Sequence, residues 1–342
     1  MKKVYSILCL FIATAAFVSC SDDDDVALSS LNNITAFEIN FEGIESDAIT
    51  YDLGNSIAVS VPFGTTLEGL VATITVDALA EIVPASGMEV DYVDGVATVF
   101  TVTAEDGTIK TYPVTVNVRG EVGSGTQLGV YEIADLYGET AVYTYAYSDA
   151  KFVSEIEIVA NDFGDITTTI VTFVFDGKNQ VIGKNVVADN SAITYVYNEL
   201  GVITTALIKK DEELTNTYSY EYDALTGELV TETRIDHTDA DSVSVISFEY
   251  ENGNVTTENR FGQVYTATYD DKNNPFKGIY PKAYSIINVG IHAVNNNNPA
   301  TGTLADEAVI YEYNVDNFPV SAAYTYFGGF ATVAKTYTYI TE

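Results

Sequence analysis

The hexapeptide Tyr218-Ser219-Tyr220-Glu221-Tyr222-Asp223 decides the fold class of the larger part of this chain. Side chains at positions i and i+2 of a β-strand point to the same face of its sheet, so the three tyrosines share one face. The opposite face carries Ser219 and Glu221, which favour solvent, and Asp223 begins a turn. The hexapeptide therefore predicts a strand of an antiparallel sheet with one aromatic face and one solvated face.

The same pattern, two aromatic residues at i and i+2 followed by an acidic or amide turn, recurs through residues 128–342. Five instances begin at Phe173, Tyr195, Tyr220, Phe248 and Tyr311. The first four start 22, 25 and 28 residues apart, a spacing that fits one β-hairpin per unit. Self-similarity at such a period indicates an array in which each hairpin packs on its neighbours. We therefore predict that residues 128–342 form a repeat-built, curved antiparallel β-sheet or half-barrel.

Residues 274–300 lack the alternation seen elsewhere in this part of the chain. Pro281 to Gly290 predicts a short helix, with proline in its first turn and glycine at its end. Asn295 to Asn298 predicts a loop. We expect this excursion to cap one end of the sheet.

Residues 31–118 predict a separate all-β domain. Alternating runs such as Ile57–Val61 and Val114–Val118 are separated by turn residues such as Asp94-Gly95 and Asp106-Gly107. About seven short strands in such a length are typical of an immunoglobulin-like β-sandwich. The Gly-rich residues 119–127 then predict a linker.

The first residues predict a processing and anchoring signal. Lys2 and Lys3 precede a mostly apolar stretch that is too short for a membrane span and ends at Cys20. This stretch resembles the bacterial lipobox, which implies removal of residues 1–19 and a lipid on Cys20. In the alternative interpretation, an ordinary secretory peptide carries an incidental cysteine.

An acidic tether is expected to follow the lipidated cysteine over residues 20–30. The residues that define its character are Ser21, Asp22, Asp23, Asp24 and Asp25. They resemble the surface-export signal of Bacteroidetes lipoproteins. That resemblance implies an outer-membrane protein held by its N-terminal lipid and exposed at the cell surface.

Longer resemblances cover both predicted domains. The segments VPFGTTLEGLVATITV (61–76) and FTVTAEDGTIKTYPVTVNV (100–118) resemble the immunoglobulin- or cadherin-like module of Bacteroidetes surface lipoproteins. The aromatic repeat resembles the tyrosine–aspartate (YD/RHS-like) repeat and a C-terminal domain of unknown function found in such lipoproteins. The resemblance of the first module implies a spacer or binding module rather than an enzyme.

The charge of the chain excludes one class of partner. Its 342 residues contain 15 Lys+Arg and 49 Asp+Glu, giving a formal net charge of −34. We expect no nucleic-acid binding, because little positive charge is present to displace phosphate counterions. Residues 21–124 hold 18 of the acids and residues 125–342 hold 31, so the acidity is spread along the chain. It is better interpreted as the surface of a secreted β protein than as a ligand site.

Candidate site residues come from the aromatic faces and from one acidic loop. The tyrosine faces pack the sheet in one interpretation and stack sugar rings or apolar ligands in the other. As a ligand face we predict Tyr218, Tyr220, Tyr222, Tyr311 and Tyr313, together with residues 274–300. Calcium is a further hypothesis at Asp236, Asp239 and Asp241, although a solvated hairpin loop explains these residues more simply.

No catalytic residue, metal site or cofactor is predicted. Nucleophile-elbow, P-loop and dinucleotide-binding motifs are missing, and the two histidines are far apart in the sequence. We therefore expect a non-catalytic binding or structural role at the outer membrane, with a glycan or another surface protein as partner. The alternatives are a carboxylate-dependent polysaccharide hydrolase and a purely structural stalk or adhesin subunit.

Overall fold

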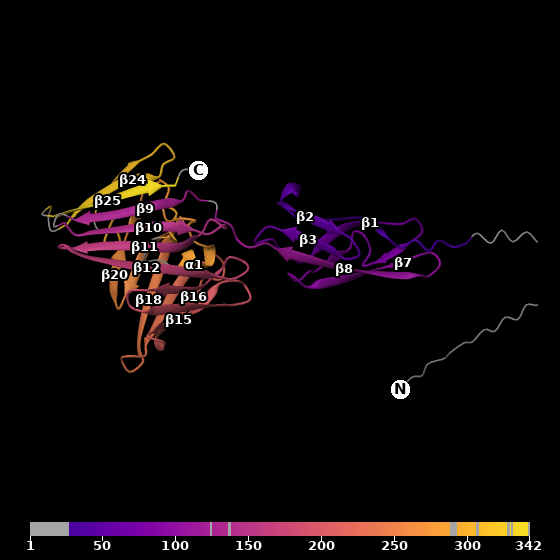
Figure 1. Cartoon of the computed structure of the whole chain (residues 1–342), viewed down its shortest axis with the longest axis horizontal. Coiled ribbons are helices and arrows are strands. Elements are labelled where there is room, and N and C mark those ends of the chain that lie inside the picture. Colours follow the sequence, from indigo (N-terminus) through magenta and orange to yellow (C-terminus); the bar gives the residue numbers. More distant parts are fainter. Residues whose placement is uncertain are drawn as a thin grey trace, which may run out of the picture. The chain divides into compact units, whose positions relative to one another are not determined.

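In the computed structural model, the described residues are 27–123, 125–135, 138–287, 293–305, 308–326, 329 and 331–340. They form two compact units whose main bodies are residues 67–116 and 117–342. Cys20 and the residues Ser21 to Asp25 lie outside the described part of the chain. Both units are built almost entirely from β-strands (Figure 1).

The first unit is a β-sandwich. One sheet has the strand order β1 (Ile34–Asn40), β4 (Leu70–Val76), β6 (Glu89–Val90). The other runs β2 (Thr50–Leu53), β3 (Ile57–Val61), β8 (Ile109–Val118), β7 (Ala97–Thr103), β5 (Glu81–Val83), and a 3₁₀ turn, η1, spans Ser46–Ala48. Phe37 of β1 meets Phe100 of β7 edge to face, with ring centroids 5.7 Å apart. This contact joins the two layers, and it confirms the sandwich that the alternation predicts.

The second unit is a 15-stranded antiparallel sheet with a short helix. From β9 to β20 each strand pairs with the next in the chain, and β25 then pairs back onto β9. In sheet order the strands are β20 (Gln263–Thr266), β19 (Asn254–Arg260), β18 (Ser242–Glu251), β17 (Leu229–Asp236), β16 (Glu213–Tyr222), β15 (Ile203–Lys210), β14 (Ser191–Tyr197), β13 (Val181–Val186), β12 (Asp165–Phe175), β11 (Val153–Asp162), β10 (Thr140–Tyr147), β9 (Leu128–Asp135), β25 (Ala331–Tyr339), β24 (Pro319–Tyr326) and β23 (Ile310–Tyr313). A separate pair joins β21 (Thr268–Tyr269) to β22 (Pro299–Thr301), and α1 spans Lys282–Ile287. Figure 1 shows the strand direction turning along the sheet from β9–β12 to β15–β20, as in the predicted curved sheet.

The recurring aromatic pairs stand where strands end and the sheet bends. Register shifts occur just before Phe175, Tyr197, Tyr222, Tyr250 and Tyr313, the second aromatic residue of each of the five instances. The partner strand carries one extra residue at each of these bulges, for example Thr204 opposite Val196 and Tyr197. A bulge bends its strand and increases the local twist, so repeating it at the same place curves the whole sheet.

The two members of a pair have different structural roles. The first is buried in four of the five instances, and Tyr311 is half-buried. We call the face of the sheet that carries Phe173 and Tyr195 the inner face. The second often sends its hydroxyl to a backbone carbonyl at the start of a preceding strand. Tyr197 donates to the carbonyl of Val181 over 2.9 Å, and Tyr147 donates to that of Leu128 over 2.9 Å. Where this bond forms, a hairpin is joined to the preceding one by a side chain as well as by the strand ladder.

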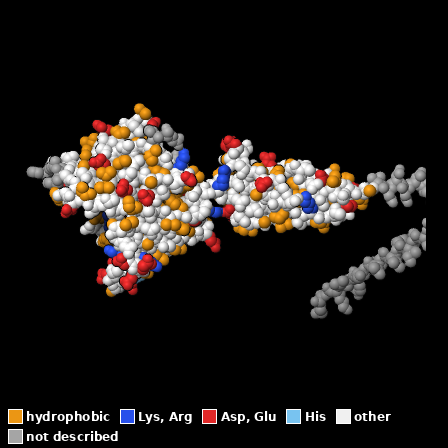
Figure 2. All heavy atoms as spheres, viewed as in Figure 1, with side chains coloured by type: hydrophobic (Ala, Val, Ile, Leu, Met, Phe, Trp, Pro, Cys, Tyr) orange, Lys and Arg blue, Asp and Glu red, His pale blue; other side chains and the backbone are white. Residues whose placement is uncertain are grey.

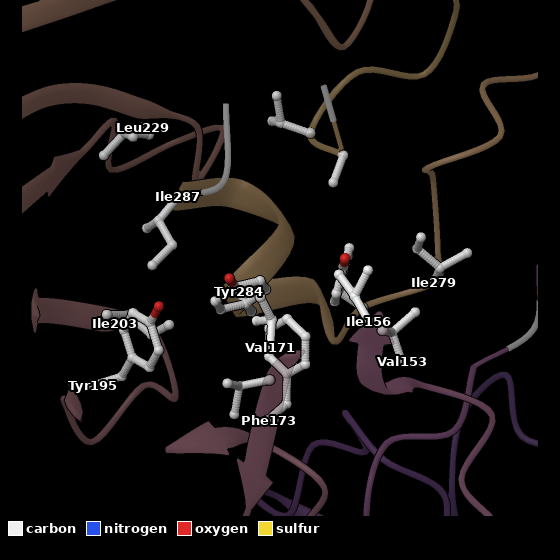
Figure 3. Packing of buried hydrophobic residues seen from close by; sticks show 14 of the residues in the cluster. Val153, Ile156, Val171, Phe173, Tyr195, Ile203, Leu229, Ile279, Tyr284 and Ile287 are labelled. Atoms are coloured by element: carbon white, nitrogen blue, oxygen red, sulfur yellow. The ribbon is translucent and has the colours of Figure 1, made fainter. Parts of the chain in front are cut away.

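The excursion at 274–300 lies on the inner face of the curved sheet, at the end where the aromatic pairs stand. The predicted helix forms as α1 directly after Pro281. Its Tyr284 is buried against Phe173 and Tyr195, with ring centroids 5.6 and 5.4 Å apart (Figure 3). Asn295 is fully buried and accepts the backbone N–H of Val255 at 2.9 Å. The excursion is therefore part of the core of the second unit.

Candidate functional site

A cavity of about 380 Å³ opens on the inner face of the second unit. Its walls come from strands β13 to β19 and from α1. The lining residues are Lys184, Ile193, Tyr195, Ala206, Ile208, Tyr218, Tyr220, Glu232, Arg234, Phe248, Glu258, Arg260, Tyr284 and Ile287. We call this cavity the inner pocket; it combines aromatic rings with five charged side chains.

The strand register brings these side chains together. Ala206 pairs with both Tyr195 and Tyr218, and Tyr218 pairs in turn with Arg234. A second row runs from Tyr220 through Glu232 and Ile246 to Arg260. Directly paired residues point to the same face of the sheet, so the two rows form the floor of the pocket.

Two glutamate–arginine pairs occupy this floor. Glu232 accepts a hydrogen bond from Nε of Arg234, and Glu258 accepts one from Nε of Arg260 and another, 2.8 Å long, from its Nη2. The glutamates are buried, whereas the arginine side chains are 40% and 42% exposed. Burial raises the pKa of Glu232, while the charge of Arg234 lowers it. Two ion pairs thus stand in one cavity, with the guanidinium groups toward solvent.

Aromatic rings lie beside these cations. The guanidinium carbon of Arg234 lies 5.0 Å from the ring centre of Tyr218, and that of Arg260 lies 5.1 Å from the ring centre of Tyr265. Cations over ring faces are attracted by the negative charge of the π-system. The pairs hold the guanidinium planes in fixed positions beside the cavity.

Lys184 contributes a further positive charge. It faces the same side of the sheet as its register partners Phe173 and Ile193. Burial lowers its pKa, and the charge of Asp189 opposes that shift. Among the described residues, no hydrogen bond or ion pair engages its ammonium group.

The predicted tyrosine ligand face is divided between two places. Tyr218 and Tyr220 line the inner pocket, whereas Tyr222 donates its hydroxyl to the carbonyl of Ile203. Tyr311 and Tyr313 lie on β23, far along the sheet, with rings stacked 5.8 Å apart. Many tyrosines of the inner faces pack against other rings, which is the first of the two interpretations made from the sequence.

Tyr311 and the excursion at 274–300 share a smaller cavity of about 40 Å³. The hydroxyl of Tyr311 donates to the carbonyl of Pro299 over 2.9 Å, and that of Tyr313 donates to Asp270. The asparagines of the excursion also bond within the protein, as Asn274 does to the carbonyl of Asn295 over 2.9 Å. These polar groups hold the excursion in place.

The acidic loop of the calcium hypothesis has internal partners. Asp236 accepts both the backbone N–H and the hydroxyl of Thr238, at 2.8 and 2.6 Å. Asp241 lies 2.5 Å from Nδ1 of His237. In the part of the chain that the structure describes, no group of three or more His, Cys, Asp or Glu side chains is arranged to hold a metal ion.

Five charged residues of the inner pocket were not predicted, although the sequence carries a signal for four of them. Glu232-Thr233-Arg234 and Glu258-Asn259-Arg260 repeat the pattern Glu-x-Arg on two strands. Residues at i and i+2 share a face, so a buried glutamate places its arginine on the inner face as well. Lys184 has no such signal.

A family match lies in the first unit. Residues 34–116 match the family model described as SGBP, N-terminal. The match begins at the first residue of β1 and ends two residues before the end of β8. It covers the sandwich and none of the inner pocket.

Solved structures from Bacteroides species show distant likeness. A porin-like protein from Bacteroides uniformis is 16% identical over 63% of this chain and 99% of its own, with a TM-score of 0.44. A putative glycoside hydrolase from Bacteroides thetaiotaomicron is 11% identical over 92% of this chain and 99% of its own, with a TM-score of 0.23. Since both scores are below 0.5, no conclusion about this chain follows from them. No curated protein matches the chain.

Within the described residues, no helix has the length and apolar character that a membrane span requires.

Proposed function

We propose that this chain is a lipid-anchored surface protein that binds a glycan in the inner pocket without cleaving it. The observation that carries the proposal is the match of residues 34–116 to the SGBP N-terminal model, in which SGBP stands for surface glycan-binding protein. The inner pocket supports it with the chemistry that sugars require. Cys20 would carry the lipid, and Ser21 to Asp25 would direct export to the surface.

The division of labour between the two units follows from what each contains. The module at 31–118 acts as a spacer or an accessory binding surface, and the linker at 119–127 connects it to the sheet domain at 128–342. Of the cavities described above, the inner pocket is the larger and carries both ring faces and fixed cations. Glycan binding is therefore assigned to the second unit.

Carbohydrate recognition combines apolar contact with hydrogen bonds. The half-buried ring of Tyr218 and the buried ring of Tyr220 offer faces for the C–H groups of a sugar. Arg234 uses only its Nε for hydrogen bonds among the described residues, which leaves its Nη groups to donate to sugar hydroxyls. Apolar walls with a few fixed polar groups are typical of small-molecule sites.

Removing the ring of Tyr218 tests the proposal. We expect Tyr218→Ala to weaken glycan binding about 10-fold or more, because stacking and the support of Arg234 are lost together. Affinity for a glycan first identified on an oligosaccharide array would be measured by calorimetry on the full chain.

Tyr324→Ala is the matched control. The ring of Tyr324 also lies under a cation, Lys335 at 5.0 Å, but does not line the pocket. Equal losses in both variants would contradict the assignment of the site. A full chain that binds no oligosaccharide would instead favour the structural stalk.

A hydrolase is the second candidate, because two buried carboxylates, Glu232 and Glu258, line the same cavity. Glycoside hydrolysis uses a pair of carboxylic groups, one of which keeps its proton, and burial raises the pKa of Glu232. Glu232 nevertheless accepts a hydrogen bond from Arg234, whose charge lowers the pKa of that carboxyl and so favours its ionised form. Release of reducing ends from a bound glycan, abolished by Glu232→Gln, would establish the hydrolase; binding without release supports the proposed function.

A further inference from the structure

The charges of the inner pocket do not cancel. Glu232 is compensated by Arg234 and Glu258 by Arg260, so the two pairs together add no net charge. Lys184 remains as an additional cation in the same cavity. A chain with a net charge of −34 has thus placed three of its 15 basic residues around one pocket.

The ammonium group of Lys184 makes no hydrogen bond or ion pair among the described residues. Lys184 is half-buried, and charges withdrawn from water are normally paired because only a partner offsets the lost hydration. Asp189, whose charge acts on Lys184, is on an exposed turn and accepts a hydrogen bond from the hydroxyl of Ser191 at 2.7 Å. Burial lowers the pKa of Lys184, as expected for an ammonium group that lacks a partner.

We propose that the inner pocket takes an acidic glycan, and that Lys184 binds the anionic oxygen of its carboxylate or sulfate group. The proposal rests on the proposed function, since it names the class of glycan for the same site. The Nη groups of Arg234 lie in the same pocket and donate to the same anion or to neighbouring hydroxyls. Planar guanidinium groups are suited to such oxyanions.

The acidity of the whole chain does not oppose this assignment. Figure 2 shows acidic side chains dispersed over the visible surface rather than gathered in one place. At physiological ionic strength the Debye length is about 8 Å, so charges farther away are largely screened. The pairing inside the pocket therefore decides the preference of the site.

An array with three classes of probe tests the proposal: neutral oligosaccharides, hexuronate oligomers and sulfated oligosaccharides. We expect the full chain to bind acidic probes in preference to neutral ones. The hexuronate and sulfated arms identify which anionic group is recognised. The methyl ester of a bound hexuronate oligomer, which keeps the sugar but loses the charge, is expected to bind at least 10-fold more weakly.

Lys184→Met and Lys184→Arg separate charge from packing. Lys184→Met keeps an unbranched apolar side chain and is expected to lose at least 10-fold in affinity for the acidic probe, whereas Lys184→Arg retains most of it. Lys209→Met is the matched control, because Lys209 is an exposed lysine of β15 outside the pocket. Lys184→Met is also expected to keep or raise the thermal midpoint, because it removes a half-buried charge that no hydrogen bond or ion pair engages among the described residues.

Different results would refute glycan binding and the preference for an acidic glycan. If the chain binds neutral glycans alone, or if Lys184→Met binds the acidic probe as well as the original chain does, the acidic ligand is wrong and glycan binding stands. If no probe of any class binds, both proposals fail.

Discussion

Removing the hydroxyl of a repeated tyrosine should change the stability differently at two equivalent positions. Tyr197 and Tyr250 are each the second aromatic residue of a pair and each follows a bulge. The hydroxyl of Tyr197 donates to the carbonyl of Val181 over 2.9 Å, and Val181 has no exposed surface. The hydroxyl of Tyr250 is buried and has no hydrogen-bond partner among the described residues. Replacing either residue by phenylalanine removes only that oxygen.

The expected magnitudes follow from these partners. Tyr197→Phe leaves a buried carbonyl without its donor, which should cost about 1–3 kcal/mol of unfolding free energy. Tyr250→Phe removes a buried hydroxyl whose lack of a partner is itself unfavourable, so we expect no loss or a gain of about 1 kcal/mol. The two variants should therefore differ by about 1–4 kcal/mol, although the chemical change is the same.

Urea denaturation of the full chain, followed by far-ultraviolet circular dichroism, measures the difference. The midpoint of the transition should fall for Tyr197→Phe and stay or rise for Tyr250→Phe, with unchanged slopes. Equal shifts in the same direction would refute the argument, because the hydroxyl partners would then not set the stability of the repeat.

Two further predictions concern the packed interior. Tyr284→Ala should cost about 3–5 kcal/mol, since the ring is 2% exposed and touches Phe173 and Tyr195. Lys282→Ala, at an exposed position of the same helix, should stay within about 0.5 kcal/mol; a small loss in Tyr284→Ala would show that α1 is not part of the core. Burial raises the pKa of Tyr92 and of Tyr195 from 10.0 to about 12. The folded state therefore keeps these two protons at a pH where the unfolded chain loses them. Their contribution to the free energy of unfolding is complete below pH 10 and is lost between pH 10 and about 12. Phenolate absorbance should rise together with unfolding in that range, and titration of every tyrosine near pH 10 in the folded chain would contradict it.

Local pattern was sufficient to predict the strands. Alternation over two residues determines which side chains share a face, and that rule holds for any strand whatever its neighbours. The hexapeptide at 218–223 therefore predicted both the strand and the inward face of Tyr220, and the spacing of the pairs predicted a sheet built from hairpins. Proline at 281 and the break in alternation likewise predicted α1.

The position of the excursion could not be predicted from local pattern. Contacts such as that of Tyr284 with Phe173 join residues more than 100 positions apart, so no local pattern records them. Which tyrosine hydroxyls find an acceptor depends on the same long-range geometry. The difference between Tyr197 and Tyr250 is therefore visible only in the folded chain.

The sequence by itself determined the β-class, the repeat and the aromatic face, because these depend on the order of residues along single strands. The tertiary structure alone decided that Lys184, Glu232 and Glu258 meet in one pocket. These residues lie on β13, β17 and β19, and only the register between strands and the curvature of the sheet bring them together. Composition fixes how many charges a chain has, whereas pairing across strands fixes which of them are left without a partner.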